Sequence, residues 1–434
     1  MTRIMWVILV ACLGAVGFEL VDSGAADVFL EAKRPDFEQI PIGVLGFPDG
    51  TVSDLQGNKV TEILAADLRR SYVFSLSDVT RLGVKVNGAG PPEKRALKKV
   101  TDQGVSVVVW GRLSSRGRDL VLDRHIYDGS TEEMGVSKQY VGPRSLMREM
   151  THRLADELVY RYVGEAGIAR TKIAYVGEDG GSRELYVMDY DGFTPRQVTA
   201  NGFLNISPAW SPDRRFLVYT SYRKPTRRNI EIIELRSGKR YTLVSLPGMN
   251  ITPALSPDGG KLAFATSKDG NSEIYTMQMK GRSLARLTVN RAGDLSPSWS
   301  PSGQEMVFTS DRGGGPQIYV MNADGSNVRR LTFQGNYNAA PSWSPNGDWI
   351  AYVCRTEGRY KICLIRPDGG ARKQVTVGTG LDDSPSWAPD GRHLVFSSTK
   401  QGQSHIYMIN DDGTQIERLT FGATRYSTPS WSPA

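Results

Sequence analysis

Ser296-Pro-Ser-Trp-Ser-Pro301 is one of six versions of a single motif in this chain. The other versions begin at Ser207, Thr252, Ala340, Ser384 and Thr428. The anchor positions of the six motifs are, in chain order, Trp210, Leu255, Trp299, Trp343, Trp387 and Trp431. Successive anchors are separated once by 45 residues and four times by 44. A repeat of this length is typical of β-propeller blades and predicts an array of similar structural units.

Each repeat contains an apolar strand pattern, a polar turn, a second strand pattern, a tight turn and a short strand, as in residues 306–332. The hairpins and the anchors are out of phase, because the array starts with a hairpin at residues 173–189 and ends with an isolated anchor at residues 428–433. Pairing of this last anchor with the first hairpin would complete a ring. We therefore predict a six-bladed β-propeller closed by the C-terminal strand, an arrangement that protects the edges of its sheets.

Length and composition are those of a folded protein with more than one domain, since the chain has 434 residues and 39% of them are apolar. The formal charge of +7 is spread along the chain without a long basic run. Nucleic-acid binding usually requires a concentrated basic patch. We therefore expect no nucleic-acid partner.

The first 25 residues have the pattern of a secretory signal peptide. Arg3 precedes an apolar run over residues 4–18, and small residues surround the expected cleavage site after Ala25 or Ala26. The mature protein is then exported and soluble. An alternative is that residues 9–12 form a lipobox, which would make Cys12 a lipid anchor.

Cys354 and Cys363 are the cysteines that would remain after cleavage, and they flank the turn of one predicted hairpin. In an oxidising compartment a cross-strand disulfide is one interpretation. Two buried thiols are the other, because the register of the hairpin decides whether the sulfurs can meet.

Residues 26–165 have a different pattern, which predicts a small α/β domain before the propeller of residues 166–434. Apolar runs predict strands at residues 40–47 and 105–110, and alternation predicts antiparallel strands over 113–127 and 133–141. Helical spacing is found over residues 61–72, 92–103 and 143–163. No G-x-G-x-x-G follows a strand, so we expect no nucleotide and no other cofactor.

The anchor motif itself has a structural explanation. The Trp can pack between neighbouring blades, and the Pro, Asp and Gly that follow it are typical turn residues. Asp213, Asp258 and Asp390 are accordingly interpreted as turn formers and not as catalytic acids.

Function is expected in the variable dipeptides just before the anchors, which we interpret as short loops. They are Asn205-Ile206, Asn250-Ile251, Asp294-Leu295, Asn338-Ala339, Asp382-Asp383 and Tyr426-Ser427. Because each occupies the same place in its repeat, all six should converge at one end of the propeller axis and form a recognition ring. Six solvated turns are the alternative. We expect no metal there, although the carboxylates of Asp294, Asp382 and Asp383 are oxygen ligands that leave this alternative open.

The ordered parts of the chain resemble the TolB family of periplasmic Tol-Pal proteins. The resemblance rests on the export signal, the α/β domain, the junction at residues 167–176, the segment at 187–192 and the repeats. It implies a non-catalytic periplasmic adaptor that binds the lipoprotein Pal through the axial face of the propeller and TolA through the mature N-terminus. Such a role supports outer-membrane integrity and constriction during cell division, and other outer-membrane proteins are further candidate partners.

Candidate partner-binding residues follow from this resemblance and from the predicted ring. For the Pal-type partner they are Met249, Asn250, Ile251, Thr252, Asp294, Leu295, Ser296, Asn338, Asp382 and Asp383. For the TolA-type partner they are Asp27, Val28, Phe29 and Leu30.

Two other classes of function can be compared with the sequence. A propeller-gated hydrolase needs a following catalytic domain with a G-x-S-x-G elbow, and the sequence contains neither that motif nor an H-E-x-x-H metal motif. We therefore expect no enzyme. A periplasmic propeller that binds a glycan or small ligand in its axial hole remains the alternative.

Overall fold

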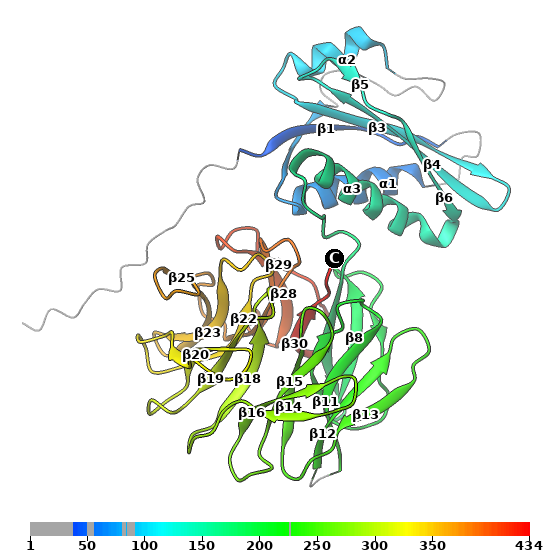
Figure 1. Cartoon of the computed structure of the whole chain (residues 1–434). Coiled ribbons are helices and arrows are strands. Elements are labelled where there is room, and N and C mark those ends of the chain that lie inside the picture. The colour runs from blue at the N-terminus through cyan, green and yellow to red at the C-terminus, as the bar shows by residue number, and fades with distance from the viewer. Residues whose placement is uncertain (1–37, 50–55, 80–83, 85–91, 225–226) are drawn as a thin grey trace, which may run out of the picture.

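The computed structural model describes residues 38–434 except 50–55, 80–83, 85–91 and 225–226. An α/β domain is stacked on one end of a β-propeller, and the C-terminus lies beside the junction of the two domains (Figure 1). The predicted signal peptide, Cys12 and the predicted TolA segment lie outside the described residues. No helix in the described part of the chain is both long and apolar enough to cross a membrane.

The α/β domain has a six-stranded mixed sheet in the order β2-β1-β3-β4-β5, with β6 also paired to β4. Its strands are β1 (Ile40–Gly46), β2 (Phe74–Ser77), β3 (Val107–Arg116), β4 (Asp119–Asp128), β5 (Glu133–Met134) and β6 (Lys138–Pro143). Its helices are α1 (Gly57–Arg70), α2 (Lys94–Thr101) and α3 (Met147–Val163), the last preceded by a 3-10 turn at Arg144–Leu146.

Alternate residues of β3 supply the two faces of this sheet. Val107 and Val109 belong to the core formed with α1 and α3, whereas Val108 and Trp110 pack with α2. Helix α1 begins a turn earlier than its apolar spacing predicts, because Asp49 accepts a hydrogen bond from the N–H of Gly57 at 2.7 Å. That cap comes from a residue eight positions away and is invisible to a local pattern.

The propeller consists of six four-stranded antiparallel sheets, which confirms the predicted blades. The innermost strands are β10 (Asn205–Trp210), β14 (Asn250–Leu255), β18 (Asp294–Trp299), β22 (Asn338–Trp343), β26 (Asp382–Trp387) and β30 (Arg425–Trp431). The second strands are β7 (Lys172–Asp179), β11 (Phe216–Lys224), β15 (Lys261–Thr266), β19 (Glu305–Ser310), β23 (Ile350–Thr356) and β27 (His393–Ser398).

The third and outer strands complete each blade. The third strands are β8 (Ser182–Asp189), β12 (Arg227–Glu234), β16 (Glu273–Gln278), β20 (Gln317–Asn322), β24 (Arg359–Ile365) and β28 (His405–Asn410). The outer strands are β9 (Arg196–Gln197), β13 (Arg240–Val244), β17 (Leu284–Arg286), β21 (Arg329–Arg330), β25 (Arg372–Gln374) and β29 (Glu417–Arg418).

The ring is closed as predicted, because C-terminal strand β30 pairs with β7 in the sheet β30-β7-β8-β9. Trp431 lies opposite Ile173, and Ser430 lies opposite Ala174. The first blade therefore takes its innermost strand from the end of the chain.

The five anchor tryptophans are buried and tie blades together. The indole N–H of Trp299 donates to the carbonyl oxygen of Ala254 in the preceding innermost strand at 3.1 Å, and Trp387 makes the same bond to Ser342 at 3.0 Å. In the turn that follows the Leu255 anchor, Asp258 accepts hydrogen bonds from Ser256 and from the N–H of Gly260, in agreement with its role as a turn former.

Cys354 and Cys363 form a disulfide between β23 and β24, which decides between the two alternatives that the sequence left open. The strands are offset so that Cys354 lies opposite Lys361 and Cys363 lies opposite Tyr352. Both cysteines are fully buried in the blade core.

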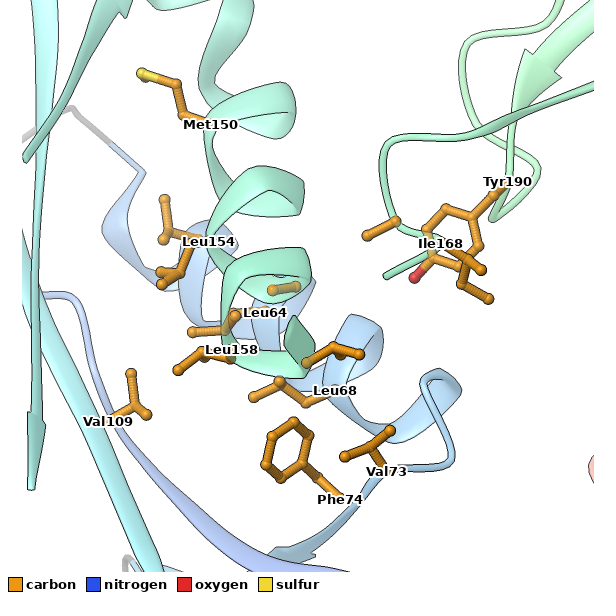
Figure 2. Close-up of a cluster of buried hydrophobic side chains, with 14 of the residues drawn as sticks. Leu64, Leu68, Val73, Phe74, Val109, Met150, Leu154, Leu158, Ile168 and Tyr190 are labelled. Carbon is orange, nitrogen blue, oxygen red and sulfur yellow. The ribbon is translucent and has the colours of Figure 1, made fainter. Parts of the chain in front are cut away.

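The two domains share one hydrophobic cluster. Figure 2 shows leucines of α1 and α3, such as Leu64 and Leu158, packed towards the sheet, with Ile168 and Tyr190 across the junction. The Tyr190 hydroxyl donates to Asp67 in α1 at 2.6 Å. Arg70, also in α1, forms an ion pair with Glu417 of β29 at 2.6 Å. The domains are therefore joined by apolar and by charged contacts.

Candidate functional site

The six innermost strands surround an axial channel. They run in the same direction along it, so every strand begins at one end, which we call the mouth, and finishes with its anchor at the other, which we call the Trp end. The mouth side contains a cavity of about 260 Å³ lined by the Ser/Thr/Ala-Pro steps of the motifs. The Trp end contains a cavity of about 560 Å³ lined by the anchors and the prolines that follow them. The α/β domain contacts the turns on the Trp-end side.

The predicted pre-anchor loops are not loops. Asn250-Ile251, Asp294-Leu295, Asn338-Ala339 and Asp382-Asp383 are the first two residues of β14, β18, β22 and β26. They pair with the second strand of the same blade, so that Asn250 lies opposite Thr266. The prediction failed because polar residues at the start of a strand resemble a turn when their partners are unknown. The six strand starts do converge on the mouth.

The first residue of each pair is buried and not free to contact a partner. Asn250, Asp294, Asn338 and Asp382 are each at most 3% exposed. The amide of Asn338 donates to Gln317 at 2.9 Å and to the carbonyl oxygen of Gln334 at 2.9 Å. Hydrogen bonds of this kind fix the side chains at the mouth, although the buried Oδ1 atoms of Asn338 and Asp294 have no hydrogen-bond partner among the described residues.

The two buried aspartates face cations. Lys361, itself 4% exposed at its side chain, contacts Asp382 at 3.1 Å, and Ser398 donates to the other carboxylate oxygen at 2.6 Å. Arg312 contacts Asp294 at 2.8 Å. Burial raises the pKa of Asp294, and the hydrogen bond from Ser310 and the charge of Arg312 only partly offset this. Both aspartates are therefore structural members of the mouth.

The second and third positions of each strand form the accessible rim. Ile251, Thr252, Leu295 and Ser296 are partly exposed, as is Met249 in the loop before β14. Asp383 is exposed, and it is the acidic side chain among otherwise neutral residues at the second position. The surrounding protein still raises the pKa of Asp383 by desolvation, which the hydrogen bond from the N–H of Ser384 opposes. The rim thus combines apolar groups with one carboxylate.

The residue before the motif's first proline is left-handed in all six innermost strands, a feature that the sequence did not predict. The φ angles of Ser207, Thr252, Ser296, Ala340, Ser384 and Thr428 lie between 43° and 55°. Each precedes a proline, a position that normally favours extended backbone. The register between the innermost and second strands shifts at this point, for example between Leu295 and Ser298. A bulge of this kind recurs in all six blades.

The metal alternative is not supported by this geometry, because Lys361 and Arg312 already neutralise two of the three carboxylates considered. Among the described residues, three ligand atoms gather only at His152, Asp189 and Asp191, near the domain junction. There Lys172 pairs with Asp189 at 2.6 Å and Arg148 with Asp191 at 2.6 Å. These contacts make ion pairs the simpler account of the cluster.

Comparison with known proteins matches both halves of the chain. The family described as the TolB beta propeller domain matches residues 160–434, and the TolB amino-terminal domain matches residues 29–134. The Tol-Pal system protein TolB of Desulfosudis oleivorans is 33% identical over 290 residues, which cover 64% of this chain and 63% of the relative. The Tol-Pal system protein TolB of Gluconobacter oxydans is 30% identical over 269 residues, which cover 61% of this chain and 56% of the relative. The chain thus spans less than two thirds of these relatives in the matched regions.

A solved structure agrees in both domains. The crystal structure of TolB from Acinetobacter baumannii superposes with a TM-score of 0.79 at 29% identity, covering 93% of this chain and 98% of that one. Hydrazine synthase of Kuenenia stuttgartiensis superposes with a TM-score of 0.52 at 14% identity, covering 61% of this chain and 47% of that chain. This likeness shows a shared fold and nothing more.

The fold and the site define a two-domain protein in which a small α/β domain is stacked on a six-bladed propeller, whose channel mouth is held by buried polar contacts. The chain belongs to the TolB family.

Proposed function

We propose that this protein is a non-catalytic periplasmic adaptor of the Tol-Pal system, and that the channel mouth binds the lipoprotein Pal. Family membership supports the system, and the mouth supports the mode of binding. In this role it would support outer-membrane integrity and constriction during division. The N-terminal segment with Asp27, Val28, Phe29 and Leu30, which lies outside the described residues, would bind TolA.

The observation that carries the proposal is the set of buried polar contacts at the mouth. The buried polar residues of the mouth are held by hydrogen bonds and ion pairs, so the rim does not need to be ordered when a partner binds. Pre-organisation of this kind reduces the entropic cost of association. The accessible groups are Ile251, Leu295 and Asp383, which suit a partner loop with an apolar tip and a hydrogen-bond donor or cation.

The test is calorimetric titration of the mature protein with the periplasmic domain of Pal. Asp383→Arg should weaken binding by at least about tenfold, because it places a cation where the rim offers a carboxylate. Asp348→Arg is the matched control, since Asp348 is exposed on the turn before β23, at the Trp-end side. Equal affinity of Asp383→Arg and wild type, with unchanged circular dichroism, would exclude the mouth as the Pal site.

The TolA assignment is tested separately. Removal of residues 27–30 should abolish binding to TolA and leave Pal binding unchanged, because the two partners are assigned to different parts of the chain. Retained TolA binding would place that partner elsewhere.

The alternative of a glycan or small ligand in the axial hole is favoured by the cavity at the Trp end. Its volume of about 560 Å³ lies within the range of small-ligand sites, and its lining combines indole, proline and serine groups. Native mass spectrometry of protein purified from the periplasm would show a bound mass under this alternative, and none under the adaptor proposal.

A further inference from the structure

The face that carries the mouth also has an outer ring of exposed apolar side chains. They occupy one repeated position, three residues after the last residue of the outer strand, in four adjacent blades. Val289, Phe333, Val377 and Phe421 are 75%, 73%, 71% and 68% exposed. Single exposed apolar residues are common on protein surfaces, but a recurrent set on one face indicates an interaction surface.

The backbone holds these four side chains at equal height. The threonine before each one accepts a hydrogen bond from the main-chain N–H of the third strand of its blade. The four bonds are Ile274 to Thr288, Ile318 to Thr332, Ile362 to Thr376 and Ile406 to Thr420, each 2.9 Å long. Identical anchoring in successive blades means that the next residues project from one plane. All four can therefore enter a flat surface at the same time.

Cations surround the apolar ring. Four exposed cations lie on the same face, Arg291 and Lys400 in loops and turns, and Arg355 and Arg425 at the ends of β23 and β30. No ion pair involves them within the part of the chain that the structure describes. In addition, Arg330 lies 5.0 Å from the ring centre of Phe333, and Arg418 lies 5.0 Å from that of Phe421.

Among the described residues, the exposed acids of this face are Asp269, Asp311, Glu357 and Asp383. Two of them are engaged, Asp269 by Lys268 and Asp311 by the N–H of Gly293. On the Trp-end side, exposed acids such as Asp258, Asp324, Asp348 and Asp368 are interspersed with exposed cations such as Arg236 and Lys280. Both faces therefore carry exposed cations, and those of the mouth face lie on the same side of the propeller as the apolar ring.

We propose that Val289, Phe333, Val377 and Phe421, with the cations around them, form a membrane-binding ring that docks on a bilayer surface containing anionic phospholipids. Apolar side chains that enter the headgroup region together with adjacent cations are the combination that holds peripheral proteins on such surfaces. A flat surface fits the four coplanar positions, whereas a protein partner would have to span four blades to touch them all. The ring is separate from the mouth, and its test requires no Pal.

The test is flotation of the mature protein with vesicles of phosphatidylcholine containing about 30% phosphatidylglycerol. The protein should float with these vesicles and not with pure phosphatidylcholine, and binding should be lost in about 0.5 M salt, which shortens the Debye length. Failure to bind the anionic vesicles at low salt would overturn the proposal, while leaving the Pal assignment untouched.

Two double variants locate the membrane contact. The double variant Phe333→Ser with Phe421→Ser should weaken vesicle binding by about tenfold or more, because it loses two large apolar side chains at the interface. Tyr160→Ser, at an equally exposed aromatic residue on α3, is the control. Arg355→Gln with Lys400→Gln should weaken binding, whereas Arg236→Gln with Lys280→Gln, on exposed turns of the Trp-end side, should not.

Each remaining outcome is decisive. Equal losses in test and control variants would show that binding is diffuse and overturn the ring. A second outcome is that wild type binds no vesicles but binds an acidic protein partner, and that the phenylalanine variants lose this partner. That result would assign the ring to the protein partner and contradict the membrane proposal.

Discussion

Trp431 donates its indole N–H to the hydroxyl of Thr171 at 2.7 Å, which joins the last strand of the chain to the residue just before the first propeller strand. The main-chain N–H of Trp431 also donates to Ser386 of the neighbouring innermost strand at 3.0 Å. Trp431 thus links strand β30 both to the start of the propeller and to the neighbouring blade. We call this place, where the ring closes, the seam. A propeller without this seam would expose two sheet edges.

Replacement of Trp431 should therefore destabilise the whole propeller. We expect Trp431→Ala to lower the free energy of unfolding by about 3–5 kcal/mol, through loss of a buried indole and the cavity it leaves. Trp431→Phe keeps a ring and loses the hydrogen bond to Thr171, so its cost should be nearer 1 kcal/mol. Urea denaturation measures both, and equal effects of the two variants would show that packing of the seam does not matter.

The two buried aspartates of the mouth should respond differently to the same change. Asp382→Asn removes the charge that balances buried Lys361 and should cost about 3 kcal/mol. Asp294→Asn should be close to neutral at pH 7, because Asn already occupies the equivalent position in three other blades and the pKa of Asp294 is raised by burial. Thermal melts of the two variants test this contrast, and a reversed order would contradict it.

The raised pKa of Asp294 predicts the direction in which the stability of the protein changes with pH. Ionisation of this group costs more in the folded than in the unfolded chain, so wild type loses stability from this residue as the pH rises from its ordinary pKa of 3.8 through the raised value. Asp294→Asn has no such group. The difference in melting temperature between variant and wild type should therefore shift in favour of the variant as the pH increases over this window. A constant difference would show that the pKa is not raised.

Arg214 occupies a left-handed turn position, with φ of 60°, where four other blades have glycine. The equivalent residues are Gly259, Gly303, Gly347 and Gly391, all with positive φ. Arg214→Gly should raise the melting temperature, because relief of backbone strain of about 1–2 kcal/mol outweighs the added flexibility of the unfolded chain. Gly303→Arg is the converse variant and should be destabilising. A destabilised Arg214→Gly would mean that the side chain contributes more than the strain costs.

The disulfide between Cys354 and Cys363 closes a short segment with a sequence separation of 9. Loss of the bond in Cys354→Ala with Cys363→Ala should lower the free energy of unfolding by about 2–3 kcal/mol, as expected for a loop of this length plus two small cavities. Reduced wild type should behave similarly. If the double variant matched oxidised wild type, the bond would have no role in stability.

The repeat explains how much of the fold follows from sequence. The spacing of Trp210 to Trp431 and the phase offset of the hairpins are long-range regularities, so they predicted the blade number and the closing strand. The start of α1 was placed late because its cap is Asp49, a residue outside the helical pattern. The disulfide could not be decided because the offset of Cys354 and Cys363 depends on hairpin register.

The candidate site was less predictable for a physical reason. The position of Asp294 and Asp382 in the repeat predicts that they lie at the mouth. It does not predict that their side chains are buried, because burial depends on partners that lie far away in sequence. Lys361 precedes Asp382 by 21 residues, and nothing in the local pattern marks the two as a pair. Exposure of Asp383, its immediate neighbour, therefore became visible only in the folded blade.

The most direct test of the account is hydrogen–deuterium exchange of the mature protein with and without the periplasmic domain of Pal. We predict new protection at the starts of β14, β18 and β26 and in the loops before them, with the Trp end unchanged. Protection confined to the α/β domain or to the Trp end, with none at the mouth, would contradict the assignment of the mouth as the partner-binding site.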